Sequence, residues 1–293
     1  MSTAAHHGPK DYYVPNPSPW PITAMLSVLL MLAGTALTIN KIEFGHWMLL
    51  AGFALLCVMF YGWFSDVIKE NMSDRYNEQV DRSFRQGMFW FIASEVFFFL
   101  SFFGALFYIR EIALPWLGGE GYLGLATHEL LHNQFVAQWP TAGPGQVGGE
   151  FEAMNAWGIP AINTFILLSS GATVTWAHWG LKENDQRKLV RGLAATIALG
   201  LLFVCLQAFE YRHAYHELNL TLGSGIYGST FYMLTGFHGF HVTMGAVMLM
   251  AILGRAIKGH FTPHNHFAFE AVAWYWHFVD VVWLGLFIFV YWL

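Results

Sequence analysis

A single carboxylic acid lies in the middle of a long apolar stretch of this sequence. The 24 residues between Arg85 and Arg110 include one charged residue, Glu95. As a helix this stretch extends about 36 Å, which is long enough to cross a bilayer. A carboxylate at the centre of a membrane span costs about 2.5–3.5 kcal/mol on insertion scales, so Glu95 is expected to face protein and to serve a function.

Four further ionisable residues occur at similar depths in other apolar stretches. His238 and His241 are three positions apart, and so are His277 and Asp280. Residues at this spacing lie on the same face of a helix. Together with Glu95 they are candidates for a buried proton-handling or metal-binding cluster. The alternative is interhelical hydrogen bonding by neutral carboxyls, and the sequence does not decide whether these faces meet.

The run HELLH matches the H-E-x-x-H pattern of zinc proteases. In that chemistry two histidines one turn apart bind zinc and the glutamate acts as general base. The corresponding residues here are His128, Glu129 and His132, and His213 or His216 could supply a third ligand. No third ligand follows at a recognisable spacing, so these residues are weak candidates and we predict no resident metal in the chain.

Several charged residues lie at the ends of apolar stretches, where lipid headgroups would be. Arg255 and Lys258 are placed to meet anionic phospholipid heads. Lys69 and Glu70 either contact lipid or form an exposed ion pair. A histidine-rich run, HFTPHNH, follows Lys258 and resembles a diiron histidine box only loosely; it carries His260, His264 and His266. His178 and Glu210 also close apolar stretches, and we expect both to cap or pair.

The composition indicates an integral membrane protein. Of 293 residues, 56% are hydrophobic and only 11% are charged, which argues against disorder and against an ordinary soluble domain. The net charge of −5, without a basic block, does not indicate nucleic acid as a partner. Cys57 and Cys205 lie inside apolar stretches and form no CxxC motif, so neither a disulfide nor a thioether-bound haem is predicted.

Hydropathy predicts seven membrane-spanning helices in an all-α integral membrane fold. The predicted spans are residues 20–40, 46–68, 84–109, 157–181, 190–211, 226–253 and 267–293. We predict one membrane domain over residues 1–293. It comprises an inside tail (1–19), the first two helices (20–68) and five further helices (84–293). The connection 111–156 is an outside loop, with a short helix near residues 126–138.

The distribution of Lys and Arg predicts the orientation of the chain. Eleven of the 14 fall on one side of the predicted spans and three on the other. By the positive-inside rule the N-terminus is then inside and the C-terminus outside. The eleven are Lys10, Lys69, Arg75, Arg82, Arg85, Lys182, Arg187, Lys188, Arg191, Arg255 and Lys258.

Small residues predict where helices approach closely in lipid. Gly87, Ser94 and Ser101 repeat every seven residues on the third predicted span. Thr235, Gly239 and Thr243 repeat every four residues on the sixth span. We therefore expect both stripes to contact neighbouring helices.

Six segments resemble one membrane-protein family and occur in the family's order over nearly the whole chain. They are NPSPWP (16–21), SEVFFF (94–99), TWAHWGL (175–181), LQAFEY (206–211), YGSTFYMLTGFHGFHV (227–242) and FEAVAWYWHFVDVVWL (269–284). With these segments the chain resembles subunit III of cytochrome c oxidase. The resemblance implies seven helices, with the first two splayed from the other five in a V whose cleft holds phospholipid.

The resemblance also implies where redox chemistry takes place. Haem and copper belong to the partner subunits I and II, and electrons come from cytochrome c through the complex. This chain would bind structural phospholipids and no redox cofactor, sustain proton uptake and protect the core from inactivation. The long loop 111–156 favours a bacterial source of the aa3 type, and hence the bacterial inner membrane.

Some residues match family positions associated with a role. Glu95 corresponds to the family's membrane-buried carboxylate, and Phe91, Arg255 and Phe64 correspond to positions associated with cleft lipid. Related mitochondrial chains have Trp at position 64, so an indole N–H to a headgroup is lost here. Lys69 stands where Arg is found, which keeps the charge but not the bidentate fork.

The leading hypothesis is thus an accessory, non-catalytic subunit of a proton-pumping oxidase. Two alternatives from other classes remain. One is a stand-alone proton or ion transporter using Glu95, His277 and Asp280, although internal repeats and Gly/Pro-broken helices are not apparent. The other is a membrane metalloenzyme using HELLH or the HFTPHNH histidines.

Overall fold

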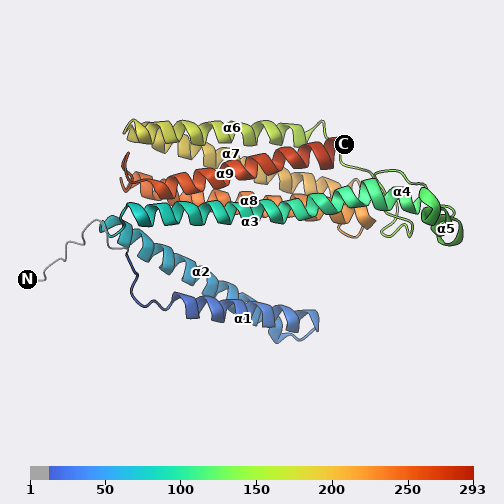
Figure 1. The fold of residues 1–293 in the computed structure, drawn as a ribbon, viewed down its shortest axis with the longest axis horizontal. Coiled ribbons are helices and arrows are strands. Elements are labelled where there is room, and N and C mark those ends of the chain that lie inside the picture. The colour runs from blue at the N-terminus through green and yellow to red at the C-terminus, as the bar shows by residue number, and fades with distance from the viewer. Residues whose placement is uncertain (1–12) are drawn as a thin grey trace, which may run out of the picture. The chain divides into compact units, whose positions relative to one another are not determined.

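The computed structural model describes residues 13–293 and is all-helical over that range. Seven of its helical segments are long and apolar enough to cross a membrane, which confirms the predicted all-α class and the number of spans (Figure 1). The first twelve residues of the predicted inside tail, with Lys10, lie outside the described residues. The long helices are α1 (Trp20–Ile39), α2 (Phe44–Met72), α3 (Glu78–Tyr108), α6 (Ile159–Lys182), α7 (Gln186–His216), α8 (Gly225–Ile257) and α9 (Phe267–Leu286).

Several helices extend beyond their predicted spans because hydropathy detects only the apolar part. Helix α3 begins at Glu78, six residues before the predicted start. Its first two turns are polar and are stabilised by the i,i+4 ion pair between Arg85 Nε and Asp81 Oδ2, at 2.7 Å. Such turns are helical without being suited to a bilayer core.

Short helical elements follow α3 and α9. They are the π-helix η1 (Ile109–Ala113), α4 (Leu114–Leu117), α5 (Gly121–Leu131) and the π-helix η2 (Phe287–Trp292). The short helix predicted at 126–138 was wrong at both ends, because α5 begins at Gly121 and ends at Leu131. His132 leaves the helical conformation with φ −139°, and a turn follows in which Phe135 N–H donates to the His132 carbonyl.

Two compact units divide the chain, Met1–Gln86 and Gly87–Leu293. In the first, α1 and α2 form a hairpin packed through glycines. A β-carbon at Gly34 would lie 2.5 Å from the backbone N of Leu49, and one at Gly45 would lie 2.5 Å from the backbone N of Thr38. Only glycine permits this approach of two backbones, which is how helices associate in lipid.

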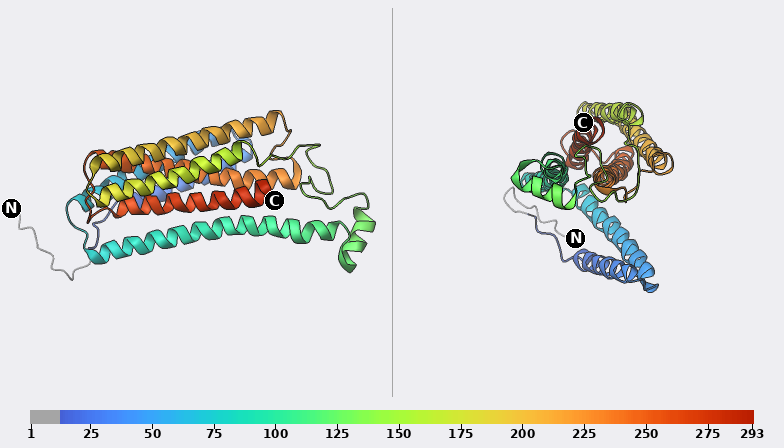
Figure 2. Two further views of the ribbon diagram at one scale, coloured as in Figure 1. Left: turned by 90° about the horizontal axis from the view of Figure 1, so that it is seen from above. Right: turned by 90° about the vertical axis from the view of Figure 1, so that its right-hand side faces the viewer.

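The second unit is a bundle of α6, α7, α8 and α9, joined by the part of α3 from Gly87 onward. Figures 1 and 2 show these helices running alongside one another. Helix α9 is the most enclosed, since 50% of its spanning window is buried, against 39% for each of α6, α7 and α8. Helix α9 therefore lies nearest the centre of the bundle.

Trp276 on α9 fills the space between three other helices. Its ring is fully buried and its Nε1–H donates to Ser170 Oγ on α6, at 2.9 Å. A β-carbon at Gly200 on α7 would lie 2.6 Å from the ring, and one at Gly245 on α8 would lie 2.8 Å from it. Trp283, two turns later, donates to Thr164 Oγ1 on α6 at 2.9 Å.

The two predicted small-residue stripes differ in outcome. On α8, Thr235 is buried and its carbonyl accepts from Gln207 Nε2 of α7 at 3.0 Å, while a β-carbon at Gly239 would lie 2.9 Å from Gln207 Oε1. On α3, Ser94 and Ser101 are exposed, and their hydroxyls bond carbonyls of their own helix. The prediction holds at these two α8 positions and is wrong for α3 within the unit Gly87–Leu293.

Candidate functional site

Glu95, the acid in the middle of α3, has a histidine partner on another helix. Glu95 Oε2 on α3 lies 3.0 Å from His241 Nε2 on α8. The side chains are 22% and 10% exposed, respectively. His241 Nδ1 lies 2.6 Å from the Phe237 carbonyl oxygen, one turn earlier on α8. Aromatic rings enclose the imidazole, with the Phe99 centroid 5.0 Å and the Tyr275 centroid 6.4 Å away.

The hydrogen bonds of His241 determine how many protons the pair holds. A carbonyl oxygen only accepts, so His241 Nδ1 carries a hydrogen and donates it to Phe237. In a neutral imidazole Nε2 is then a bare lone pair, which cannot bond a carboxylate. The contact with Glu95 therefore requires one more proton, either on Glu95 or on Nε2. With that proton the pair is neutral overall inside the membrane span.

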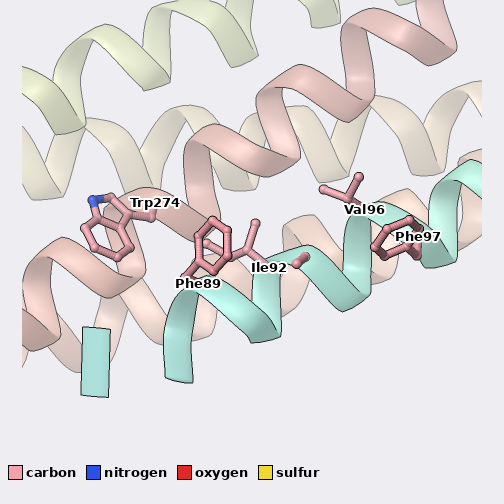
Figure 3. Close-up of a pocket in the computed structure, with 6 residues that line it drawn as sticks. Phe89, Ile92, Val96, Phe97 and Trp274 are labelled. Atoms are coloured by element: carbon pink, nitrogen blue, oxygen red, sulfur yellow. The ribbon is translucent and has the colours of Figure 1, made fainter. Parts of the chain in front are cut away.

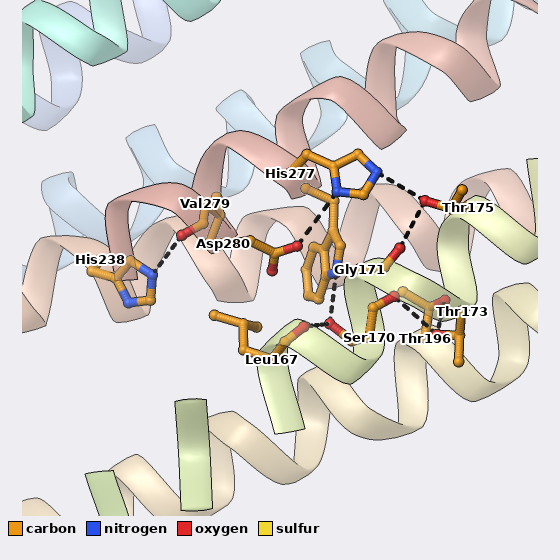
Figure 4. A network of polar contacts seen from close by, with 11 residues as sticks. Leu167, Ser170, Gly171, Thr173, Thr175, Thr196, His238, His277, Val279 and Asp280 are labelled. Atoms are coloured by element: carbon orange, nitrogen blue, oxygen red, sulfur yellow. Dashed lines mark hydrogen bonds and ion pairs between the residues drawn. The ribbon is translucent and has the colours of Figure 1, made fainter. Parts of the chain in front are cut away.

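A second histidine–carboxyl pair lies on α9, and its histidine also bonds a threonine of α6 (Figure 4). His277 Nδ1 lies 3.5 Å from Asp280 Oδ2, and His277 Nε2 lies 3.3 Å from Thr175 Oγ1. The Thr175 hydroxyl donates to the Gly171 carbonyl at 2.9 Å, so it accepts from His277 Nε2–H. His277 Nδ1 then has a lone pair facing Asp280, and this contact too requires one additional proton.

The Asp280 side chain is only 8% exposed, and its Oδ1 has no hydrogen-bond partner. Gly171 makes room for it, because a β-carbon there would clash with Asp280 Oδ2. An ionised carboxylate with an unpartnered buried oxygen would be costly. The protonated acid is consequently the form that this site favours.

His238 belongs to neither pair. Its ring is fully buried, its Nε2 lies 3.2 Å from the Val279 carbonyl on α9, and its Nδ1 has no partner. His238 and His241 therefore have different partners although they share a helix face: His238 bonds α9, and His241 bonds α3. These contacts join the five candidates as two pairs and one single residue.

The predicted lipid-binding residues of the second unit lie at the end of α8 and on α3. Arg255 stacks its guanidinium over the Phe261 ring, 4.6 Å from the centroid, and its buried Nε makes no hydrogen bond. Lys258 is exposed at the C-cap of α8. Phe91 on α3 is 47% exposed and packs against Tyr275, with the ring centroids 6.2 Å apart.

An apolar groove of about 510 Å³ lies between α3 and α9 (Figure 3). Sequence reasoning missed it, because a groove depends on which helix faces are adjacent. Its walls contain no polar residue, as an acyl chain would require. The groove is lined by Phe89, Ile92, Ala93, Val96, Phe97 and Trp274.

In the first unit, Glu70 is engaged by two tyrosines. Tyr13 donates to Oε1 at 2.9 Å and Tyr76 donates to Oε2 at 2.8 Å. Burial, together with the bond to Glu70, raises the pKa of Tyr76 far above its usual value, so this hydroxyl remains a donor. Glu70 therefore ties the segment before α1 and the α2–α3 connection to α2, and both its oxygens are occupied.

Lys69 is better placed than Glu70 to meet a headgroup. Its side chain is 73% exposed, and its Nζ lies 3.2 Å from Asp66 Oδ1. Together with Arg75 it lines a groove of about 640 Å³ in the first unit, whose other walls include Pro15, Trp20 and Trp63. Phe64 is 54% exposed beside Trp63, with the two ring centroids 5.5 Å apart.

The HELLH run does not adopt the one-turn helical pairing that the zinc pattern requires. His128 lies in α5, where its Nδ1 is 3.1 Å from the Leu117 carbonyl, but His132 is the non-helical C-cap. Over residues 13–293, one group of three His, Asp or Glu side chains has all its ligand atoms within 4.8 Å, and it lies elsewhere.

That group consists of His178, His266 and Glu270. His178 lies in the last turns of α6, while His266 is the N-cap of α9 and Glu270 lies one turn later. Both histidines are recognisable in the sequence as candidates, but nothing there joins them, and Glu270 was not predicted. The i,i+4 spacing of His266 and Glu270 was the available signal.

Comparison with known proteins agrees with the resemblance seen in the sequence. The family model described as cytochrome c oxidase subunit III matches residues 10–120 and 130–293. Cytochrome c oxidase subunit 3 of Cyprinus carpio is 40% identical over 287 residues, which is 98% of each chain. That of Equus caballus is 40% identical over 288 residues, again 98% of each chain. On these grounds the chain belongs to the cytochrome c oxidase subunit III family and is a multi-pass membrane subunit of that oxidase.

Proposed function

We propose that this chain is an accessory subunit of a proton-pumping cytochrome c oxidase that retains phospholipid and supports proton uptake for oxygen reduction to water. Its partners are subunits I and II, which hold the haem and copper, and cytochrome c reaches the complex as electron donor. The observation that carries the proposal is the Glu95–His241 pair, whose geometry requires one shared proton between two spanning helices.

Proton support follows from the chemistry of the two histidine–carboxyl pairs. Each holds one proton between an imidazole and a carboxyl group. Releasing that proton loses a contact between α3 and α8 in the Glu95–His241 pair, and a contact within α9 in the His277–Asp280 pair. Such a pair is neutral while it holds its proton and carries one negative charge after releasing it. The chain's own part is therefore to hold protons near the neighbouring subunits, with no electron transfer of its own.

Lipid retention rests on one apolar groove and separate cationic groups. The groove of the second unit takes an acyl chain against Phe89 and Trp274. Arg255, with its unpartnered Nε, and exposed Lys258 attract phosphate. In the first unit Lys69 and Arg75 line a groove suited to a headgroup.

The chain is expected in a bacterial inner membrane, with its N-terminus cytoplasmic and its C-terminus periplasmic. The 11-to-3 division of Lys and Arg supports this orientation. An odd number of spans supports termini on opposite sides of the membrane.

The test compares purified oxidase with and without this chain, reconstituted in vesicles. The depleted complex should retain its haem spectra and part of its oxidase activity, but should pump fewer protons per electron or inactivate sooner during turnover. Loss of the haem spectra on depletion would contradict a non-catalytic role. Proton flux by the purified chain alone would instead favour the stand-alone transporter.

A further inference from the structure

We infer that His178, His266 and Glu270 form a binding site for a divalent metal ion of the zinc type, which ties the end of α6 to the start of α9. The site goes beyond the function proposed above and does not depend on it. All three ligand atoms lie within 4.8 Å of one another.

The spacing of the ligand atoms fits a tetrahedral metal. Zinc binds imidazole nitrogen and carboxylate oxygen at about 2.0–2.2 Å, which separates two ligands of a tetrahedron by about 3.3 Å. Glu270 Oε1 lies 3.3 Å from His266 Nε2 and 3.6 Å from His178 Nε2. The third distance, between the ligand nitrogens of the two imidazoles, is at most 4.8 Å. A rotation of one ring would shorten it to the tetrahedral value.

His266 is held in the tautomer that a metal ligand needs. Its Nδ1 lies 3.1 Å from the Thr262 carbonyl, so Nδ1 carries the hydrogen and Nε2 is a lone pair. A backbone carbonyl that fixes the other ring nitrogen is the usual outer shell of a metal-binding histidine. The HFTPHNH loop thus orients one ligand, although only one of its three histidines belongs to the group.

The nitrogens that face Glu270 lack other partners. Nε2 of His178 and Nε2 of His266 are both buried, and neither makes a hydrogen bond. Two unsatisfied imidazole nitrogens converging on one carboxylate oxygen call for a cation between them. Three protein ligands leave the fourth tetrahedral position to water.

The surroundings fix the rings and leave the site partly open. The His178 ring centroid lies 5.5 Å from that of His266 and 5.3 Å from that of Phe269. The side chains of His178, Glu270 and His266 are 21%, 14% and 10% exposed, respectively. The site is therefore mostly buried, and each of the three side chains keeps a small exposed fraction.

The test uses the intact oxidase in detergent, stripped with a chelator and titrated with zinc chloride. Wild type should bind one zinc ion more per complex than His266→Gln or Glu270→Gln, each of which should weaken binding at this site at least tenfold. His264→Gln is the matched control, because His264 is an exposed histidine of the same loop outside the group. It should retain the wild-type stoichiometry.

X-ray absorption at the zinc edge supplies a measurement that needs no variant. Wild type carrying one zinc per complex should have two imidazole nitrogens in the first shell, with oxygen completing it, at about 2.0–2.1 Å. Equal zinc content in wild type and the two ligand variants would overturn the proposal. Fewer than two imidazoles per zinc, or no zinc retained at 100 µM, would overturn it as well and leave a plain ion pair.

Discussion

At the scale of single residues, the chemistry of this chain lies in histidines that already use one ring nitrogen in a hydrogen bond. Phe237, Thr175 and Thr262 each fix one nitrogen of a different imidazole, and the other nitrogen then faces a carboxyl group. The consequence differs with position. Within the spans such a pair requires a proton, and at the bundle end the same arrangement with a second imidazole suits a metal.

Replacing Glu95 by Gln should leave the complex assembled, because the amide N–H₂ donates to His241 Nε2 as a protonated carboxyl does. Glu95→Leu, the matched control, leaves the His241 nitrogen unsatisfied and should cost about 1–3 kcal/mol. For both variants, the measurement is the fraction of the chain that stays in the complex after treatment with detergent and heat. Loss of Glu95→Gln from the complex would mean that the proton itself, or an ionised acid, holds α3 to α8.

At the scale of elements, α9 organises the bundle because its large rings enter spaces that other helices leave open. Trp276 bonds α6 and is flanked by glycines of α7 and α8. Trp283 repeats the contact two turns later, against Phe203 at 4.7 Å between centroids. Between apolar helices in lipid, this fit and the two indole hydrogen bonds supply the stability.

Gly245→Val should destabilise the bundle by about 1–3 kcal/mol, because its side chain would overlap the Trp276 ring. Gly254→Val on the same helix is the control, since a β-carbon there meets nothing within 4 Å. The thermal midpoint of the purified complex should fall for the first variant and stay unchanged for the second. Equal midpoints would mean that Trp276 can move aside.

At the scale of the whole molecule, the described residues expose many large apolar side chains, as a bilayer requires. Among its exposed large side chains are Phe97, Phe165, Phe209 and Phe240, from four different helices. Apart from acids within the spans, such as Glu95 and Asp280, most charged residues lie near helix ends or in connections, where they meet water and headgroups.

The orientation can be tested with single cysteines in a chain whose Cys57 and Cys205 are replaced by Ala. A membrane-impermeant maleimide added to intact cells should label Val147→Cys in the outside loop. It should label Ser73→Cys, after α2, only once the membrane is opened. The reverse pattern would invert the predicted orientation, and labelling of both without opening the membrane would remove a span between them.

The sequence by itself determined the seven spans, the family and the residues at which buried chemistry was expected. These depend on local properties, namely length, mean hydropathy and the placement of a charge within an apolar stretch. Glu95, His241, His277 and Asp280 were all found this way. The same local reasoning missed the polar start of α3, because hydropathy does not detect a helix that extends into water.

Only the tertiary structure decided which of these residues are partners. The rotation of each helix and the identity of its neighbours separate His238 from His241, expose the Ser94 stripe and bring His178 to His266 across 88 positions. These contacts depend on how rings such as Trp276 fit against glycines of other helices. No single stretch of sequence contains that information, because it arises only when the bundle closes.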